Sequence, residues 1–142
     1  MIYLDTSLIV AAITPEVGTE AAQALLRSKA GEQLCVSDWV MTEVSGALAF
    51  KVRTKQIEAA QRIRALLSWR DLLDSSFNRL PIDRQAYDHA ASYFERDDIN
   101  VRSSDALHIA IADLNGCRLA TLDRVMATAA RHLGVEVVGG LI

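Results

Sequence analysis

Short apolar runs alternate along this chain with longer segments of helical periodicity, and this alternation limits the possible folds more than any other feature. Each apolar run is too short for a helix, so it is predicted to be a strand. The expected strands lie at residues 2–4, 33–36, 117–121 and 135–138, with 80–82 as a proline-containing edge strand. The expected helices lie at residues 16–29, 38–53, 55–75, 83–96, 105–115 and 124–132.

Strands that are separated by helices pair in parallel, and the helices then cover both faces of the sheet. We therefore expect an α/β fold with three layers, α/β/α, around a short-stranded and mostly parallel central sheet. At 142 residues the chain is expected to form a single domain over residues 1–142, large enough to bury a hydrophobic core. Because such crossovers are right-handed, the loops at the carboxyl ends of the strands collect at one edge.

The composition is that of a globular protein, with 51% hydrophobic and 23% charged residues. The start of the chain has no basic leader and no apolar run approaches the roughly 20 residues that span a bilayer, so a cytoplasmic location is expected. A formal net charge of −3 argues against a protein that binds nucleic acid by general electrostatics alone. Cys35 and Cys117 lie far apart in apolar runs and are expected to be buried thiols, not zinc ligands.

Four acidic residues fall where a predicted strand ends or near the start of a predicted helix: Asp5, Glu43, Asp105 and Asp123. Asp5 and Asp123 follow apolar strands, whose carboxyl ends form the usual ligand crevice of a parallel sheet. Asp105 opens a helix with an apolar middle, and Glu43 lies on the apolar face of its helix within the first turns. Because close carboxylates repel one another unless they share a proton or surround a cation, the cluster predicts a divalent-metal site.

Hydroxyl groups accompany the acids at Thr6, Ser7 and Thr121 and are expected to support them. A cage of oxygen ligands suits Mg²⁺ or Mn²⁺, whereas Zn²⁺ favours histidine and cysteine. One or two such ions bind a phosphodiester and activate a water molecule, so hydrolysis needs no side-chain nucleophile. His108, one turn after Asp105, is interpreted as an ordinary interior or surface histidine near the site.

Each acid also has an ordinary structural interpretation. Asp123 is a natural helix cap. Asp105 is another, although Ser103 and Ser104 offer equally good caps in the same place. A buried Glu43 is costly and would otherwise need a salt bridge to an arginine or lysine. The four acids are therefore informative as a set and not one by one.

Four motifs surround these acids: MIYLDTS at residues 1–7, VMTEV at 40–44, SDALHIA at 104–110 and LATLD at 119–123. In this order and over essentially the whole chain, they resemble the PIN-domain ribonucleases, and within that family the VapC-type toxins of type II toxin–antitoxin systems. The resemblance implies that Asp5, Asp105 and Asp123 bind the metal, with Glu43 as a further acid. It also implies supporting roles for Thr121 and for Ser7, which stands where many members carry asparagine.

The resemblance further implies a magnesium-dependent endoribonuclease that acts as a toxin, forms a homodimer and is held inactive by a small cognate antitoxin. Two other classes remain open. A phosphorelay receiver domain also gathers aspartates at a sheet edge, but it places two adjacent acids after its first strand, where Asp5 stands alone. A non-catalytic interaction module of the same fold is the other. A nucleotide-binding module is disfavoured because no glycine-rich loop follows Leu4 or Val36.

Overall fold

The computed structural model describes residues 1–29 and 31–141. Its centre is a four-stranded sheet in the order β3-β2-β1-β4, in which every strand pair is parallel. The strands are β1 (Ile2–Leu4), β2 (Leu34–Ser37), β3 (Phe77–Leu80) and β4 (Arg118–Ala120). The helices are α1 (Thr6–Ile13), α2 (Thr19–Ser28), α3 (Asp38–Arg53), α4 (Ala59–Ser76), α5 (Arg84–Ser92), the 3₁₀ helix η1 (Tyr93–Glu95), α6 (Ser103–Leu114) and α7 (Arg124–His132).

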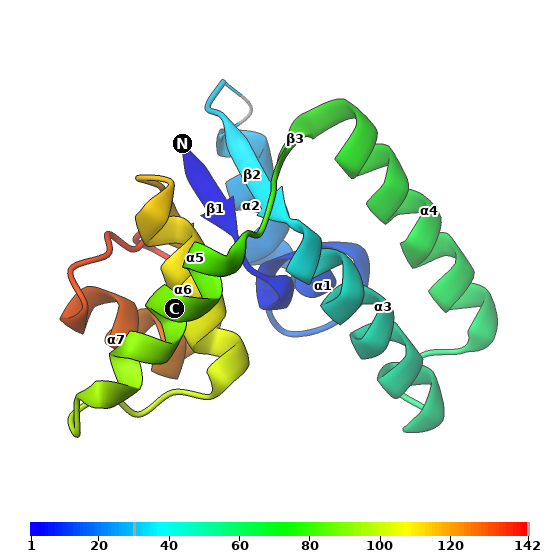
Figure 1. The fold of residues 1–142 in the computed structure, drawn as a ribbon. Helices are drawn as coiled ribbons and strands as arrows, with labels where there is room; N and C mark the ends of the chain where they lie inside the picture. Colours follow the sequence, from blue (N-terminus) through cyan, green and yellow to red (C-terminus); the bar gives the residue numbers. More distant parts are fainter. Residues whose placement is uncertain (30, 142) are drawn as a thin grey trace.

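Figure 1 shows the sheet between two groups of helices, with α5, α6 and α7 together and the long helices α3 and α4 running away from the strands. The expected α/β architecture with a short-stranded parallel sheet is therefore confirmed. Strand β1 lies between β2 and β4, and its three residues Ile2, Tyr3 and Leu4 have no exposed surface. A strand covered on both faces explains why its sequence is continuously apolar.

The expected helices at 38–53 and 124–132 are confirmed as α3 and α7. Helix α6 begins at Ser103, two residues before the predicted start, so Asp105 lies within its first turn. Gly116 follows this helix with a φ of 60°, a left-handed conformation that glycine adopts without a steric penalty.

Two sequence-based expectations were wrong, and one helix was not predicted. The edge strand is 77–80 and not 80–82, since Pro81 lacks the N–H that would continue the pairing with β2. Residues 135–138 form no strand and contribute a single parallel bridge, between Val137 and Leu119. Helix α1 was not predicted, because its eight residues are almost all apolar and leave little polar face to reveal the period.

One hydrophobic core connects the sheet with the helices around it, and α6 is its most deeply buried helix, with every residue from Asp105 to Ala112 buried. Cys35 and Cys117 are buried free thiols, as expected. In the described part of the chain, no helix is both long enough and apolar enough to cross a membrane.

Candidate active site

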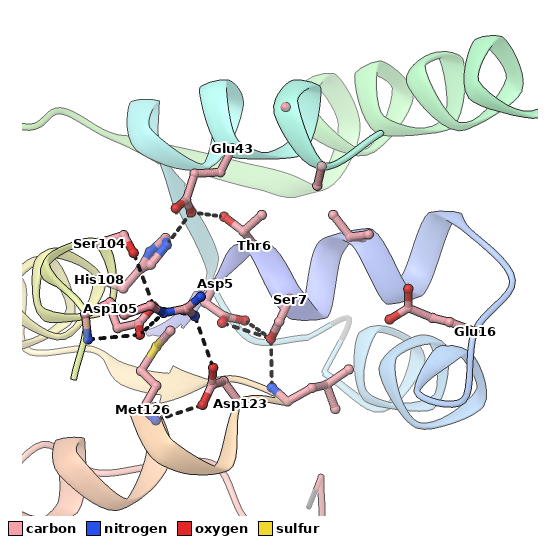
Figure 2. Close-up of a pocket in the computed structure, with 15 residues that line it drawn as sticks. Asp5, Thr6, Ser7, Glu16, Glu43, Ser104, Asp105, His108, Asp123 and Met126 are labelled. Atoms are coloured by element: carbon pink, nitrogen blue, oxygen red, sulfur yellow. Dashed lines mark hydrogen bonds and ion pairs between the residues drawn. The ribbon is translucent and has the colours of Figure 1, made fainter. Parts of the chain in front are cut away.

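A pocket of about 590 Å³ opens at the carboxyl edge of the sheet, and all four predicted acids line it. Asp5 follows β1, Asp123 follows β4, and Glu43 and Asp105 come from α3 and α6. Figure 2 shows these four side chains approaching one another, whereas Glu16, a fifth acid in the lining, lies off to one side. Chain segments that are distant in sequence therefore meet here, as the parallel topology requires.

Asp5 is the most deeply buried acid of the pocket, with 1% of its surface exposed. It caps α1, where its Oδ1 accepts a hydrogen bond from the backbone N–H of Leu8 at 3.1 Å. Ser7 Oγ lies 2.9 Å from both carboxylate oxygens, and Thr121 Oγ1 donates to Oδ2 at 2.8 Å. Burial raises the pKa of Asp5 even though the positive field of His108 and these hydrogen bonds oppose the shift.

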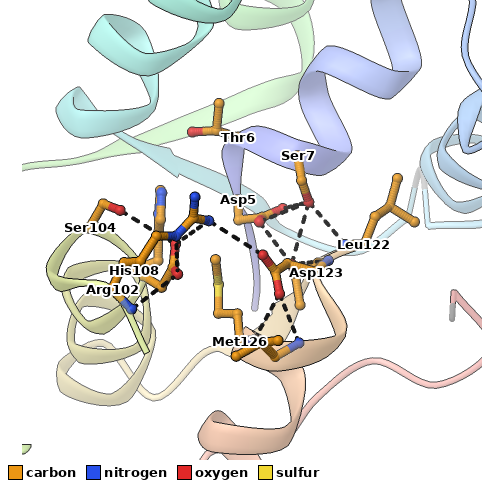
Figure 3. A network of polar contacts seen from close by, with 12 residues as sticks. Asp5, Thr6, Ser7, Arg102, Ser104, His108, Leu122, Asp123 and Met126 are labelled. Atoms are coloured by element: carbon orange, nitrogen blue, oxygen red, sulfur yellow. Dashed lines mark hydrogen bonds and ion pairs between the residues drawn. The ribbon is translucent and has the colours of Figure 1, made fainter. Parts of the chain in front are cut away.

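Thr121 also connects Asp5 to Asp123. The backbone N–H of Asp123 donates to Thr121 Oγ1 at 2.9 Å, so this buried hydroxyl contacts both segments. Asp123 Oδ1 caps α7 by accepting from the N–H groups of Val125 and Met126 at 2.8 and 3.0 Å. The helix cap expected for Asp123 is thus present, and the other oxygen, Oδ2, lies toward Arg102 (Figure 3).

Glu43 is held by Thr6, one of the hydroxyls expected to support the acids, and by His108, which the sequence did not indicate as its partner. Thr6 Oγ1 donates to Glu43 Oε2 at 2.5 Å, and His108 Nε2 lies 2.7 Å from the same oxygen. Burial alone would raise the pKa of Glu43, but the hydrogen bonds from His108 and Thr6 outweigh it and the pKa lies below its ordinary value. The basic partner of Glu43 is therefore a histidine and not the arginine or lysine considered above.

His108 belongs to a hydrogen-bonded chain that starts in the core. Its Nδ1 lies 2.9 Å from the Tyr3 hydroxyl, which lies 2.7 Å from Ser37 Oγ. His108 Nε2 donates to Glu43, because an ionised carboxylate can only accept, and the ring thereby connects Glu43 to Tyr3 and Ser37. Sequence reasoning gave His108 no role here; the available signal was its position three residues after Asp105 on a buried helix.

Asp105 is paired with an arginine that precedes it by three residues. Arg102 Nε lies 2.9 Å from Asp105 Oδ2, and one of its terminal nitrogens lies 3.2 Å from Oδ1. The same terminal nitrogen reaches Asp123 Oδ2 at 3.5 Å (Figure 3). Arg102 thus contacts two of the four acids, a role that its position just before α6 did not reveal.

The arrangement differs from the predicted metal cage. Among residues 1–29 and 31–141, no three histidine, cysteine, aspartate or glutamate side chains are grouped closely enough to hold a metal ion as they stand. The reason is visible in the contacts above, since Arg102 holds Asp105 and reaches Asp123 while His108 holds Glu43. The donor set nevertheless suits a hard cation, because four carboxylates and neighbouring hydroxyls line one pocket.

Comparison with known proteins identifies the fold. The family model described as the PIN domain matches residues 2–132, a range that includes all four acids. Mycobacterium tuberculosis VapC20, described as a toxin that cleaves the sarcin–ricin loop, superposes with a TM-score of 0.71 at 17% identity, covering 91% of this chain and 95% of VapC20. No curated protein matches the sequence.

Two further solved structures share the fold. The structure of FitAB bound to a DNA fragment gives a TM-score of 0.72 at 24% identity, covering 97% of this chain and 94% of that one. A toxin–antitoxin complex from Klebsiella pneumoniae gives a TM-score of 0.60 at 17% identity, with 87% of each chain covered. The match to the PIN-domain model favours that family over a phosphorelay receiver domain.

Proposed function

The chain belongs to the PIN-domain family, and from this premise we propose that it is a magnesium-dependent endoribonuclease that acts as the toxin of a toxin–antitoxin pair. The substrate is RNA, the bond that breaks is a phosphodiester, and the nucleophile is water. Mn²⁺ serves as a substitute for Mg²⁺, because both favour carboxylate and water oxygens. The site of action is the cytoplasm.

The observation that carries this proposal is a buried carboxylate without a basic partner. In the part of the chain that the structure describes, each hydrogen bond to Asp5 comes from a hydroxyl or a backbone N–H. An ionised carboxylate that is 1% exposed is costly unless a cation balances it, and the raised pKa of Asp5 reflects that cost. A cation at this carboxylate would remove the cost.

Asp5, Asp105 and Asp123 would hold the ion, with Glu43 as a further acid. When bound, the ion lowers the pKa of a water molecule and stabilises the charge that develops on the phosphate. The protein fixes the direction of the ligands in advance: Thr121 and Ser7 hold the Asp5 carboxylate, and the first turn of α7 holds one oxygen of Asp123. Such supporting contacts keep ligands in place when the ion arrives.

The choice of RNA rests on the fold relatives. VapC20 is described as cleaving the sarcin–ricin loop, a structured RNA, so we propose a structured RNA as substrate here too. The net charge of −3 means that general electrostatics give little affinity, and binding then depends on the ion and on particular basic residues near the pocket.

Exposed apolar side chains support the proposed protein partners, a cognate antitoxin and a second copy of the chain. Phe50 on α3 and Ile63 and Leu67 on α4 are 52%, 60% and 54% exposed. Three large exposed apolar side chains on neighbouring helices are typical of a surface that a protein partner covers. One fold relative is itself a toxin–antitoxin complex.

RNA cleavage by purified protein tests the proposal. Total cellular RNA is incubated with the protein and Mg²⁺, and the new ends are mapped by sequencing. Asp5→Asn, Asp105→Asn and Asp123→Asn should each lower the cleavage rate by orders of magnitude, and chelation with EDTA should abolish cleavage. Glu43→Gln should also slow cleavage, either as a lost ligand or as a lost water-orienting group.

Glu16→Gln is the matched control. Glu16 lines the same pocket and the substitution removes the same charge, but its carboxylate pairs with Lys51 at 2.7 Å. This variant should cleave RNA at nearly the wild-type rate. Wild-type rates for all three aspartate variants, or cleavage that survives EDTA, would show that the assigned roles are wrong. Induced expression in bacteria tests the toxin role, since wild type should arrest growth and Asp5→Asn should not.

A further inference from the structure

Arg102 occupies the space between two acids that would hold the metal. It makes a two-pronged contact with Asp105, through Nε at 2.9 Å and a terminal nitrogen at 3.2 Å, and it reaches Asp123 at 3.5 Å. Both oxygens of Asp105 are therefore engaged by the guanidinium. A divalent ion needs the same oxygens, so the ion and the guanidinium compete for them.

The Arg102 side chain is also placed so that it can move away from Asp105. Arg102 is the residue before the first turn of α6, and its side chain is 75% exposed, whereas the side chain of Asp105 is 7% exposed. The head group therefore approaches a buried carboxylate from the open mouth of the pocket. The contact with Asp123 is long, and an ion pair with one largely exposed partner is weakly held.

We propose that Arg102 is the resident cation of the metal-free site: it neutralises Asp105 and Asp123 until a divalent ion displaces it, and its head then binds an RNA phosphate at the pocket mouth. This inference rests on the proposed metal-dependent cleavage. Displacement frees a positive charge at the mouth only when the metal is bound. Metal and RNA therefore bind with positive coupling, because the ion releases the group that receives the phosphate.

Mn²⁺ binding in the absence of RNA tests whether Arg102 competes with the metal ion. Free Mn²⁺ is measured by electron paramagnetic resonance during titration of wild type, Arg102→Gln and Arg124→Gln. The Arg124 control removes the same charge from the residue next to Asp123, and among the described residues Arg124 makes no ion pair. Arg102→Gln should bind Mn²⁺ about three- to tenfold more tightly than wild type, since the competitor is gone, and Arg124→Gln should change the affinity far less.

The salt dependence of cleavage tests whether the displaced Arg102 binds an RNA phosphate. Loss of one phosphate contact should raise KM for RNA in Arg102→Gln and make the slope of log(kcat/KM) against log[salt] shallower by about 0.7–0.9, the values for one phosphate contact on a single strand and on a duplex. Arg102→Lys keeps the charge without the two-pronged geometry. It should restore the salt slope while still binding Mn²⁺ more tightly than wild type.

The outcomes separate this inference from the proposed function. Equal or weaker Mn²⁺ binding by Arg102→Gln, in proteins that cleave RNA with Mg²⁺, would overturn the role of Arg102 and leave the nuclease proposal standing. Tighter binding by Arg124→Gln to the same degree would also overturn it, because the effect would then be general charge and not competition. An absence of Mn²⁺ binding in every variant would overturn both proposals.

Discussion

The contact between His108 and Glu43 should contribute measurably more to stability than a similar contact at the surface. His108 Nε2 lies 2.7 Å from Glu43 Oε2, and the two side chains are 2% and 24% exposed. His89 and Asp113 form a pair of nearly the same length, 2.8 Å, with side chains 32% and 44% exposed. Because the distances match, the comparison isolates the effect of burial.

The expected magnitudes follow from solvent screening. A hydrogen bond to a charged group contributes about 1.5–3 kcal/mol, and the partial exposure of Glu43 reduces this to about 1–2 kcal/mol for the His108 pair. The exposed pair of His89 and Asp113 should contribute about 0.2–1 kcal/mol.

A double-mutant cycle for each pair measures these values. The histidine, the acid and both together are replaced by alanine, and the free energy of unfolding is obtained from urea titrations at pH 7. His108→Ala also leaves a cavity and removes a partner of Tyr3, but these effects occur in both arms of the cycle and cancel in the coupling energy. A coupling energy for His108–Glu43 below that of His89–Asp113 would refute the reasoning.

Three further predictions use the same unfolding assay. Burial raises the folded-state pKa of Asp5 above its unfolded value, so the free energy of unfolding of the metal-free protein should fall as pH rises from the ordinary aspartate range through the raised pKa. Asp5→Asn should lack this fall, and an identical pH profile would contradict the assignment. Thr121→Val removes hydrogen bonds to Asp5 and Asp123 and should cost about 1–3 kcal/mol and slow RNA cleavage; unchanged stability would mean that these bonds are not formed. Tyr3→Phe removes the hydroxyl that bonds both Ser37 and His108 and should cost about 1–3 kcal/mol, less than His108→Ala, which also leaves a cavity; a cost above that of His108→Ala would contradict this ranking.

The convergence of the acids was predictable because it depends on topology alone. Strands β1 and β4 are neighbours and parallel, so the residues that follow them, Asp5 and Asp123, emerge at one edge. The periodicity of residues 38–53 then placed Glu43 on the apolar face of its helix, and Asp105 was placed at a helix start. None of these inferences needed a side-chain conformation, and the structure places all four acids in one pocket.

The basic partners of the acids, Arg102 and His108, were not predictable in the same way. Whether Arg102 reaches Asp105 depends on side-chain torsions near a helix start, and whether Tyr3 reaches His108 depends on how β1 packs against α6. A tyrosine in an apolar strand looks like any core residue, so its hydroxyl gives no pattern in the sequence. Helix α1 was missed for a related reason, since a helix without a polar face shows no period.

The central claim, that the four carboxylates gather around a divalent cation, is tested most directly by anomalous diffraction from crystals soaked in Mn²⁺. We expect one or two anomalous peaks in the pocket, each ligated by at least two of Asp5, Glu43, Asp105 and Asp123, with Asp5 among the ligands. A Mn²⁺ that binds elsewhere, or a pocket without an anomalous peak at saturating Mn²⁺, would contradict the claim.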